Sequence, residues 1–167
     1  MENENLKPTF KSQILTIVQN NKKKLIIILC TLIISVISTI LFNIYKAGQN
    51  KIISEKFIEA GILLSSKNLE NSKEIYEEII LSKNKFYSPL ALNTILENNL
   101  EKDSKKIINY FEKIEELKIE LEQKNLVKIK KALYLIKINK NNEGEKLLKE
   151  IISDNSIWKY TALEILK

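Results

Sequence analysis

Carboxylates, serines and lysines are the abundant side chains with which this chain could do chemistry. Two carboxylates can act as general acid and general base when both reach one substrate atom. The adjacent pairs Glu77-Glu78 and Glu115-Glu116 point about 100° apart on a helix, so their members do not converge. Glu74 and Glu78 share a helix face, but no glycine-rich loop frames them. We interpret these carboxylates as solvated helix faces and expect the protein not to be an enzyme.

The scarce residue types exclude several kinds of site. The chain has no His, one Cys and three Gly. Without His there is no imidazole catalysis, and a single Cys excludes most zinc sites and any disulfide within the chain. Three glycines are too few for the repeated-Gly loops that bind phosphates. We expect no metal and no cofactor, and the scarcity of Gly and Pro beside abundant Lys, Glu, Ile and Leu predicts an all-α fold.

The charge of the chain is unevenly distributed. All 27 basic residues are Lys, and 21 acidic residues leave a net charge of +6. Residues 1–24 carry five Lys against two Glu, whereas residues 46–167 carry 22 Lys against 19 acidic residues. A nucleic-acid-binding domain has a dense basic face with aromatic residues, and the mixed charges of 46–167 do not fit it. We therefore expect no nucleic-acid partner.

An uncharged run from Leu25 to Tyr45 is the most specific signal in the chain. Its 21 residues would form a helix of about 31 Å, which matches the hydrocarbon core of a bilayer. A buried core helix needs a larger protein around it. A cleaved signal peptide has a shorter apolar region and a small-x-small site, which is absent after Tyr45. We predict a transmembrane helix over 25–45, with these residues at its membrane boundaries: Lys22, Lys23, Lys24, Tyr45 and Lys46.

The lysines beside this run predict its orientation. More Lys lie in the N-terminal flank than in the C-terminal flank, and the cytoplasmic flank is usually the more basic one. Residues 1–24 are therefore predicted to be a short cytoplasmic basic arm, and 46–167 an exported domain. Cys30 lies inside the predicted span, so the exported domain has no thiol, as suits an oxidising compartment.

Residues 46–167 show helical patterns separated by Asn-rich breaks. Apolar residues recur at helical spacing, and the breaks fall at 67–68, 84–89, 98–99 and 139–142. The three longest apolar stripes are Ile53, Phe57, Ala60 and Leu64; Ile107, Phe111, Ile114, Leu117 and Leu121; and Leu126, Ile129, Leu133 and Ile136.

A short motif recurs along these helices and predicts a repeat. A small residue is followed three and seven positions later by apolar residues, and a small or apolar residue stands about twelve positions before it. The copies begin 32 and 40 residues apart. They comprise Ala60, Ser72, Ile75 and Ile79; Ala91 beside Leu92, Ser104, Ile107 and Phe111; and Ala132, Gly144, Leu147 and Ile151.

This pattern indicates stacked helical hairpins. A small residue lets two antiparallel helices approach, and a hairpin buries its apolar face only by stacking on the next one. The segments 84–92 and 155–163 are also similar to each other. In both, aromatic residues precede an Ala-Leu pair near a predicted helix start, with the Ala at Ala91 and Ala162. We predict a solenoid of three hairpins and a final helix over 156–167, with a generic helical bundle as the alternative.

The layout resembles the YfgM-like ancillary subunit family of the SecYEG translocon, which has one span followed by tetratricopeptide-like repeats. The resemblance rests on the span, on Phe57 to Ile80 with Tyr76 at an aromatic position of the motif, and on the helix starts at 86–92 and 157–163. The Gly, Trp and Pro positions of the 34-residue repeat are mostly absent. Members of that family are also generally longer than this chain.

The resemblance implies a protein-interaction module of the bacterial inner membrane with a periplasmic C-terminal domain. Such a subunit assists or hands over translocated polypeptides, and its partners are translocon subunits, periplasmic chaperones and exported polypeptides. The same architecture suits a membrane-anchored scaffold for cell-envelope or division complexes. A membrane-anchored enzyme is a third hypothesis, for which no catalytic constellation is found among the residues.

Overall fold

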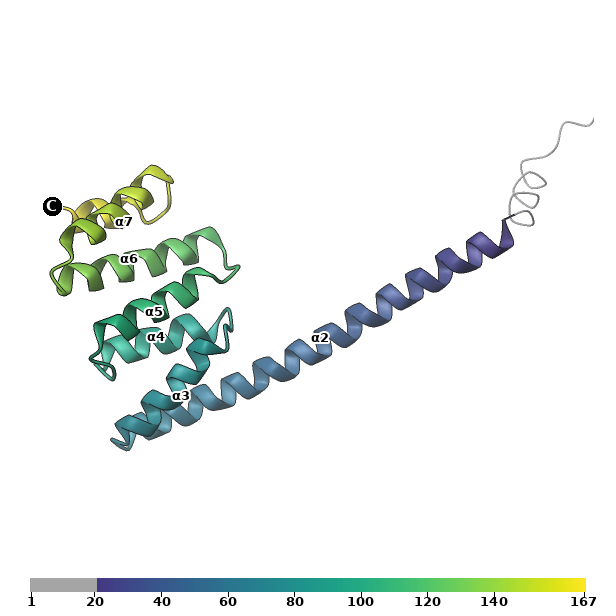
Figure 1. Ribbon diagram of the computed structural model, residues 1–167, viewed down its shortest axis with the longest axis horizontal. Coiled ribbons are helices and arrows are strands. Elements are labelled where there is room, and N and C mark those ends of the chain that lie inside the picture. The colour runs from purple at the N-terminus through teal and green to yellow at the C-terminus, as the bar shows by residue number, and fades with distance from the viewer. Residues whose placement is uncertain (1–20) are drawn as a thin grey trace, which may run out of the picture. The chain divides into compact units, whose positions relative to one another are not determined.

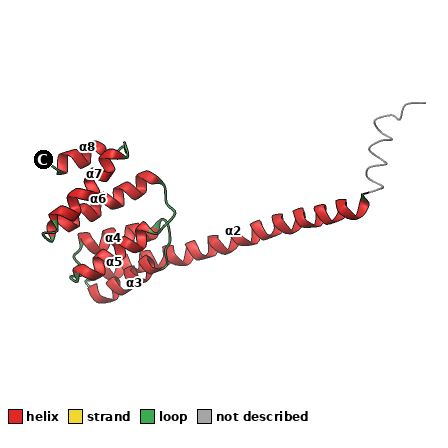
Figure 2. Ribbon diagram, turned by 45° about the horizontal axis from the view of Figure 1, so that its top comes forward, coloured by secondary structure: helices red, strands yellow, loops and turns green. Residues whose placement is uncertain are grey.

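The computed structural model describes residues 21–167, and every regular element in that range is a helix (Figure 2). This confirms the predicted all-α class. Most of the predicted basic arm, 1–24, lies outside the described residues. The described part has seven helices, which are α2 (Lys22–Ser65), α3 (Leu69–Leu81), α4 (Tyr87–Glu97), α5 (Ser104–Glu115), α6 (Leu121–Lys137), α7 (Asn141–Ser153) and α8 (Lys159–Ile165). The chain divides into two compact units, Met1–Gln49 and Asn50–Lys167.

The first unit holds the apolar part of α2. In the described part of the chain, α2 alone is long and apolar enough to cross a membrane, and its apolar stretch is unburied. The Thr31 and Thr39 hydroxyls donate to the carbonyls four residues earlier, both at 2.9 Å, so the helix itself satisfies them. A signal sequence near an N-terminus would have the same properties.

The second unit begins within the same helix, because α2 continues without a break past Lys46 to Ser65. No proline interrupts it there, and Gly48 is the one weak helix former between the apolar run and Asn50. The boundary-flanking residues Lys22, Lys23, Lys24, Tyr45 and Lys46 are all exposed on this helix.

Helical hairpins pack in chain order through the second unit, from the end of α2 to α8 (Figure 1). This confirms the coarse prediction of stacked hairpins. The core forms two clusters. The first cluster runs from the end of α2 through α5 and includes Val127 of α6. The second cluster joins α6, α7 and α8, with Ile129, Leu148 and Ile151 buried.

The turns between helices use left-handed residues that are not glycine. Lys67, Lys83, Asn99, Asn139 and Asn155 all have φ between 49° and 63°. Each follows the end of a helix, where one left-handed residue lets the chain close the last turn. Three of the five are Asn, the side chain that tolerates this conformation best after Gly. The Asn-rich breaks in the sequence therefore coincide with these helix ends.

Helix starts reveal a repeat register that differs from the predicted one in the second copy. In α3, α5 and α7, the first intrahelical hydrogen bond runs from the backbone N–H of the fourth helical residue to the carbonyl of the N-cap residue. These fourth residues are Ser72, Ile107 and Gly144, and each N···O distance is 3.1 Å. Ser104, the predicted small residue of that copy, is instead the first residue of α5. In this register the copies start 35 and 37 residues apart. Every copy then buries its residues at +4 and +7, which are Tyr76 and Ile79, Phe111 and Ile114, and Leu148 and Ile151.

The residue at this register position determines how closely the two helices of a hairpin approach. The Ser72 hydroxyl donates to the carbonyl of Ala60 at 2.8 Å. A Cβ on Gly144 would lie 2.8 Å from the carbonyl oxygen of Ala132. Ile107 stands at this position in α5, and α4 and α5 pack less closely than α6 and α7 do.

The predicted packing residues fall into two groups by their burial. Buried are Ala60, Ser72, Tyr76, Ile79, Ala91, Ile107, Phe111, Ala132, Gly144, Ile151 and Ala162, whereas Ile75, Ser104 and Leu147 are half-buried. Two residues of the predicted stripes are exposed, Leu121 at 56% and Leu133 at 45%. Leu121 begins α6 beyond a turn that ends the stripe of α5. Leu133 lines a groove between α4 and α6.

Candidate functional site

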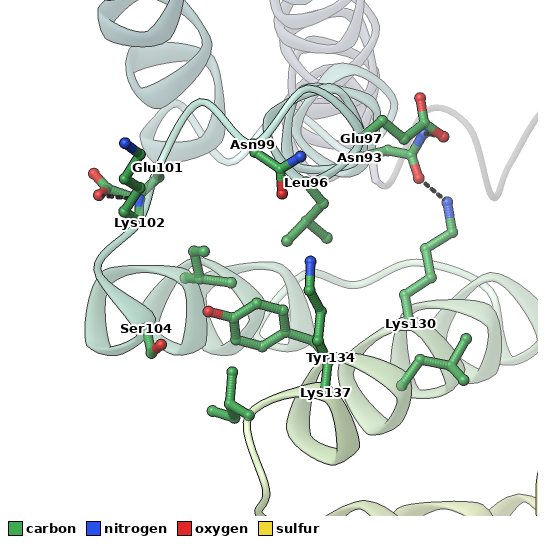
Figure 3. Close-up of a pocket in the computed structure, with 13 residues that line it drawn as sticks. Asn93, Leu96, Glu97, Asn99, Glu101, Lys102, Ser104, Lys130, Tyr134 and Lys137 are labelled. Carbon is green, nitrogen blue, oxygen red and sulfur yellow. Dashed lines mark hydrogen bonds between the residues drawn. The ribbon is translucent and has the colours of Figure 1, made fainter.

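A groove of about 490 Å³ lies between the C-terminal half of α4, the start of α5 and the C-terminal half of α6. Leu96 of α4 and Tyr134 of α6 extend into it from opposite sides (Figure 3). Ile107 and Ser104 of α5 complete the lining. The groove therefore opens at the hairpin in which Ile107 replaces a small residue and α4 packs less closely on α5.

A second hollow of about 220 Å³ continues along the same two helices toward their N-terminal ends. Phe86, Leu90 and Leu126 line it. Both hollows share Asn93 of α4 and Lys130 of α6, and the Lys130 ammonium donates to the Asn93 amide oxygen (Figure 3). We call the two hollows together the α4–α6 groove, which this hydrogen bond divides into two compartments.

The walls of the α4–α6 groove expose apolar side chains. Phe86 is 64% exposed, Leu90 39% and Leu133 45%. A single exposed apolar residue is ordinary on a protein surface, but apolar residues gathered on two facing helices mark a binding surface. The arrangement can accept apolar side chains between α4 and α6, while amide and ammonium groups at the division supply hydrogen bonds.

Glu101 holds the loop at one end of the α4–α6 groove. Its Oε1 accepts the backbone N–H groups of Lys102 at 2.7 Å and Asp103 at 2.8 Å, and its Oε2 lies 3.4 Å from the Lys106 Nζ. These donors, the Asp103 N–H first among them, lower the pKa of the Glu101 carboxyl, although burial opposes the shift. The ionised carboxylate is thus part of the loop structure.

We expect Glu101→Gln to lower the free energy of unfolding at pH 7 by about 1 kcal/mol, because charged acceptors make the stronger hydrogen bonds. The folded pKa lies below the unfolded value, so this stabilisation is present above the unfolded pKa. It is lost as the pH falls through the folded pKa, and the variant should then match the wild type. Urea titrations between pH 7 and about 3 measure this difference. An exposed, unpaired carboxylate provides the control, Glu74→Gln, and an equal effect there would contradict the role of Glu101.

The carboxylates first considered for catalysis are mostly engaged in ion pairs. Glu78 lies 2.5 Å from Lys56, Glu116 2.6 Å from Lys83, and Glu115 2.8 Å from Lys131. Glu77 is half-buried near Tyr110, and burial together with this carboxylate raises the pKa of the Tyr110 phenol. Within residues 21–167, no cluster of His, Cys, Asp and Glu is suited to hold a metal ion. These contacts join neighbouring helices and serve the packing of the unit.

Sequence reasoning missed the α4–α6 groove and several buried residues. Ser88 donates to the Ile79 carbonyl at 2.7 Å and joins α3 to α4. The Asn125 side chain is fully buried, and neither of its amide atoms meets a hydrogen-bonding group among the described residues. The only available signal was the alternation of apolar and basic residues along 126–137, which we interpreted as a core stripe.

The fold and the groove define an all-α protein of sequentially packed helical hairpins with one long apolar N-terminal helix. Comparisons with protein-family models, with curated proteins and with solved structures find no match to the chain. The site is therefore interpreted from its own geometry.

Proposed function

We propose that this protein is a membrane-anchored, non-enzymatic interaction module that binds polypeptides in the α4–α6 groove. The observation that carries the proposal is the set of exposed apolar side chains on the facing walls of α4 and α6, with Phe86 and Leu133 prominent among them. Grooves between helices accept the apolar face of a partner segment. The apolar run of α2 supplies the anchor.

We further propose that the second unit is a tetratricopeptide-like solenoid. Copies that start 35 and 37 residues apart, each with buried residues at +4 and +7, support this assignment. The resemblance to the YfgM-like family supports a periplasmic domain beside the protein-export channel of a bacterial inner membrane. Translocon subunits, periplasmic chaperones and exported polypeptides are the proposed partners in that setting.

Crosslinking from native membranes tests the proposal. A photoreactive residue in place of Leu133, on the groove wall, is expected to capture translocon subunits or export chaperones. The same residue in place of Lys149, on the exposed surface of α7, is the matched control. Equal capture at both positions would contradict the groove. Capture only of cell-division proteins would favour the scaffold hypothesis. A reporter that is active only outside the cytoplasm, fused after Lys167, tests the orientation independently.

A further inference from the structure

We propose that the α4–α6 groove selects an acidic amphipathic polypeptide segment, one that alternates carboxylates with apolar side chains. This inference rests on the proposed function and names the chemistry of the occupant. Two features carry it. One is the excess of lysines over carboxylates in the groove lining, and the other is the order of side chains along α6.

The lysines that line the α4–α6 groove lack acidic partners. Lys85, Lys102, Lys130 and Lys137 contribute to its walls, and none forms an ion pair with the described residues. Two carboxylates, Glu97 and Glu101, line the groove beside these four lysines. Glu97 is the exposed carboxylate of the lining, and it accepts from Asn93 at 2.6 Å instead of from a lysine. The groove therefore offers an excess of positive charge that the domain does not neutralise.

Apolar and basic side chains alternate along the wall formed by α6. Leu126, Lys130, Leu133 and Lys137 all line the α4–α6 groove, and successive members lie one helical turn apart. The row extends over about 16 Å of helix. A segment that contacts the whole row must present an apolar group, an anion, an apolar group and an anion at a similar interval. A helix with Leu and Glu at alternate turns on one face has this spacing.

The division of the groove favours a polypeptide over a lipid. The Lys130–Asn93 hydrogen bond crosses between the walls and separates the two compartments. Separate side chains of a polypeptide can enter the compartments on either side of this bond. A continuous acyl chain would have to break it. At the division, a carboxylate of the occupant would accept a second hydrogen bond from the Lys130 ammonium, which has three donors and keeps its bond to Asn93, and charged acceptors make the stronger bond.

A binding titration on the full chain in nanodiscs of zwitterionic lipid tests the inference. The probe is a fluorescein-labelled helical peptide of Leu, Glu and Ala, with Leu and Glu alternating at each turn of one face. We expect binding that weakens with salt and weakens about tenfold in the double variant Lys130→Gln/Lys137→Gln. Because Lys130 also bonds Asn93, the exposed Lys137 is replaced alone in a second variant. Lys146→Gln on α7 makes the same change of charge away from the groove and should bind normally.

Each alternative result has a distinct meaning. If a peptide with Gln in place of Glu binds equally well, and Leu133→Asn abolishes its binding, the groove function stands and the acidic selectivity is overturned. If no peptide binds although Leu133 still crosslinks to its partners, the acidic class fails and the proposed function survives. If anionic vesicles or a single-stranded oligonucleotide displace the peptide with higher affinity, the inference is overturned in favour of that class of ligand.

Discussion

Replacing Gly144 with alanine is expected to destabilise the second unit by about 1–3 kcal/mol. The added Cβ would lie 2.8 Å from the Ala132 carbonyl oxygen and 2.8 Å from Cγ1 of Ile136. A backbone carbonyl cannot rotate away as a flexible side chain can, so α6 and α7 must separate. Alanine gains up to about 1 kcal/mol in helix propensity, which the steric conflict outweighs. Urea titration followed by the fluorescence of Trp158, the one Trp of the chain, measures the loss.

Gly61 offers a matched control for this substitution. It also lies inside a helix, but a Cβ there would meet only the Tyr76 hydroxyl, at 3.7 Å, an ordinary contact. Gly61→Ala should therefore raise the free energy of unfolding by about 1 kcal/mol through helix propensity alone. If both variants change the free energy of unfolding in the same direction, the close approach of α6 and α7 does not require glycine at position 144.

Several features of the fold could be predicted from single residues and their spacing. The long apolar helix follows from a run without charges, and the helix ends follow from Asn residues that tolerate left-handed backbone. The first and third hairpins were also predictable, because Ser72 and Gly144 each stand twelve residues after an Ala. In both hairpins the carbonyl of that Ala lies so close to the next helix that only a small residue fits beside it. The twelve-residue spacing between the two small residues is visible in the sequence.

The second hairpin was assigned the wrong register for a physical reason. Ser104 follows Asp103, whose side chain accepts the Lys105 N–H at 2.8 Å and begins α5. A small polar residue at a helix start matches the small-residue motif as well as a small residue at the contact between two helices does. The true contact position carries Ile107, which spacing alone presents as one more apolar residue. Its side chain contributes to the lining of the α4–α6 groove.

The α4–α6 groove could not be predicted from sequence because it is made by residues far apart in the chain. Asn93 and Lys130 meet across 37 positions. Leu133 belongs to an apolar stripe by its spacing, yet α4 does not cover it. Which turn of an amphipathic helix remains open depends on the separation of its neighbours, which the spacing of apolar residues within one helix does not express. The alternation of apolar residues and lysines along 126–137 did not by itself indicate a groove, since only the folded chain shows which lysines find carboxylates.

Phe111 of α5 packs against α6, the helix to which both core clusters contribute residues, and is the residue whose loss should cost most. It is 1% exposed in the first cluster, and its ring lies 6.1 Å from that of Tyr134 on α6. The Lys131–Glu115 ion pair, at 2.8 Å, is a further contact between α5 and α6. In a stacked array, stability is the sum of the units and their interfaces, so a weakened interface lets neighbouring parts unfold separately.

Phe111→Ala is therefore expected to lower the free energy of unfolding of the first cluster by about 3–5 kcal/mol and to split one transition into two. Trp158 reports on the second cluster, since its indole N–H donates to the Glu122 carbonyl at 3.0 Å. Circular dichroism reports on all the helices. In the variant the dichroism should begin to fall at a lower urea concentration than the fluorescence changes, whereas the wild-type curves should coincide.

The exposed Leu121 provides the control for this experiment, because Leu121→Ala removes an apolar side chain without opening the core. It should shift both curves by less than about 0.5 kcal/mol and leave them coincident. If Phe111→Ala lowers stability but its two curves still coincide, the clusters are coupled by more than the α5–α6 contacts. If Phe111→Ala costs no more than Leu121→Ala, the Phe111–Tyr134 contact does not hold α5 against α6.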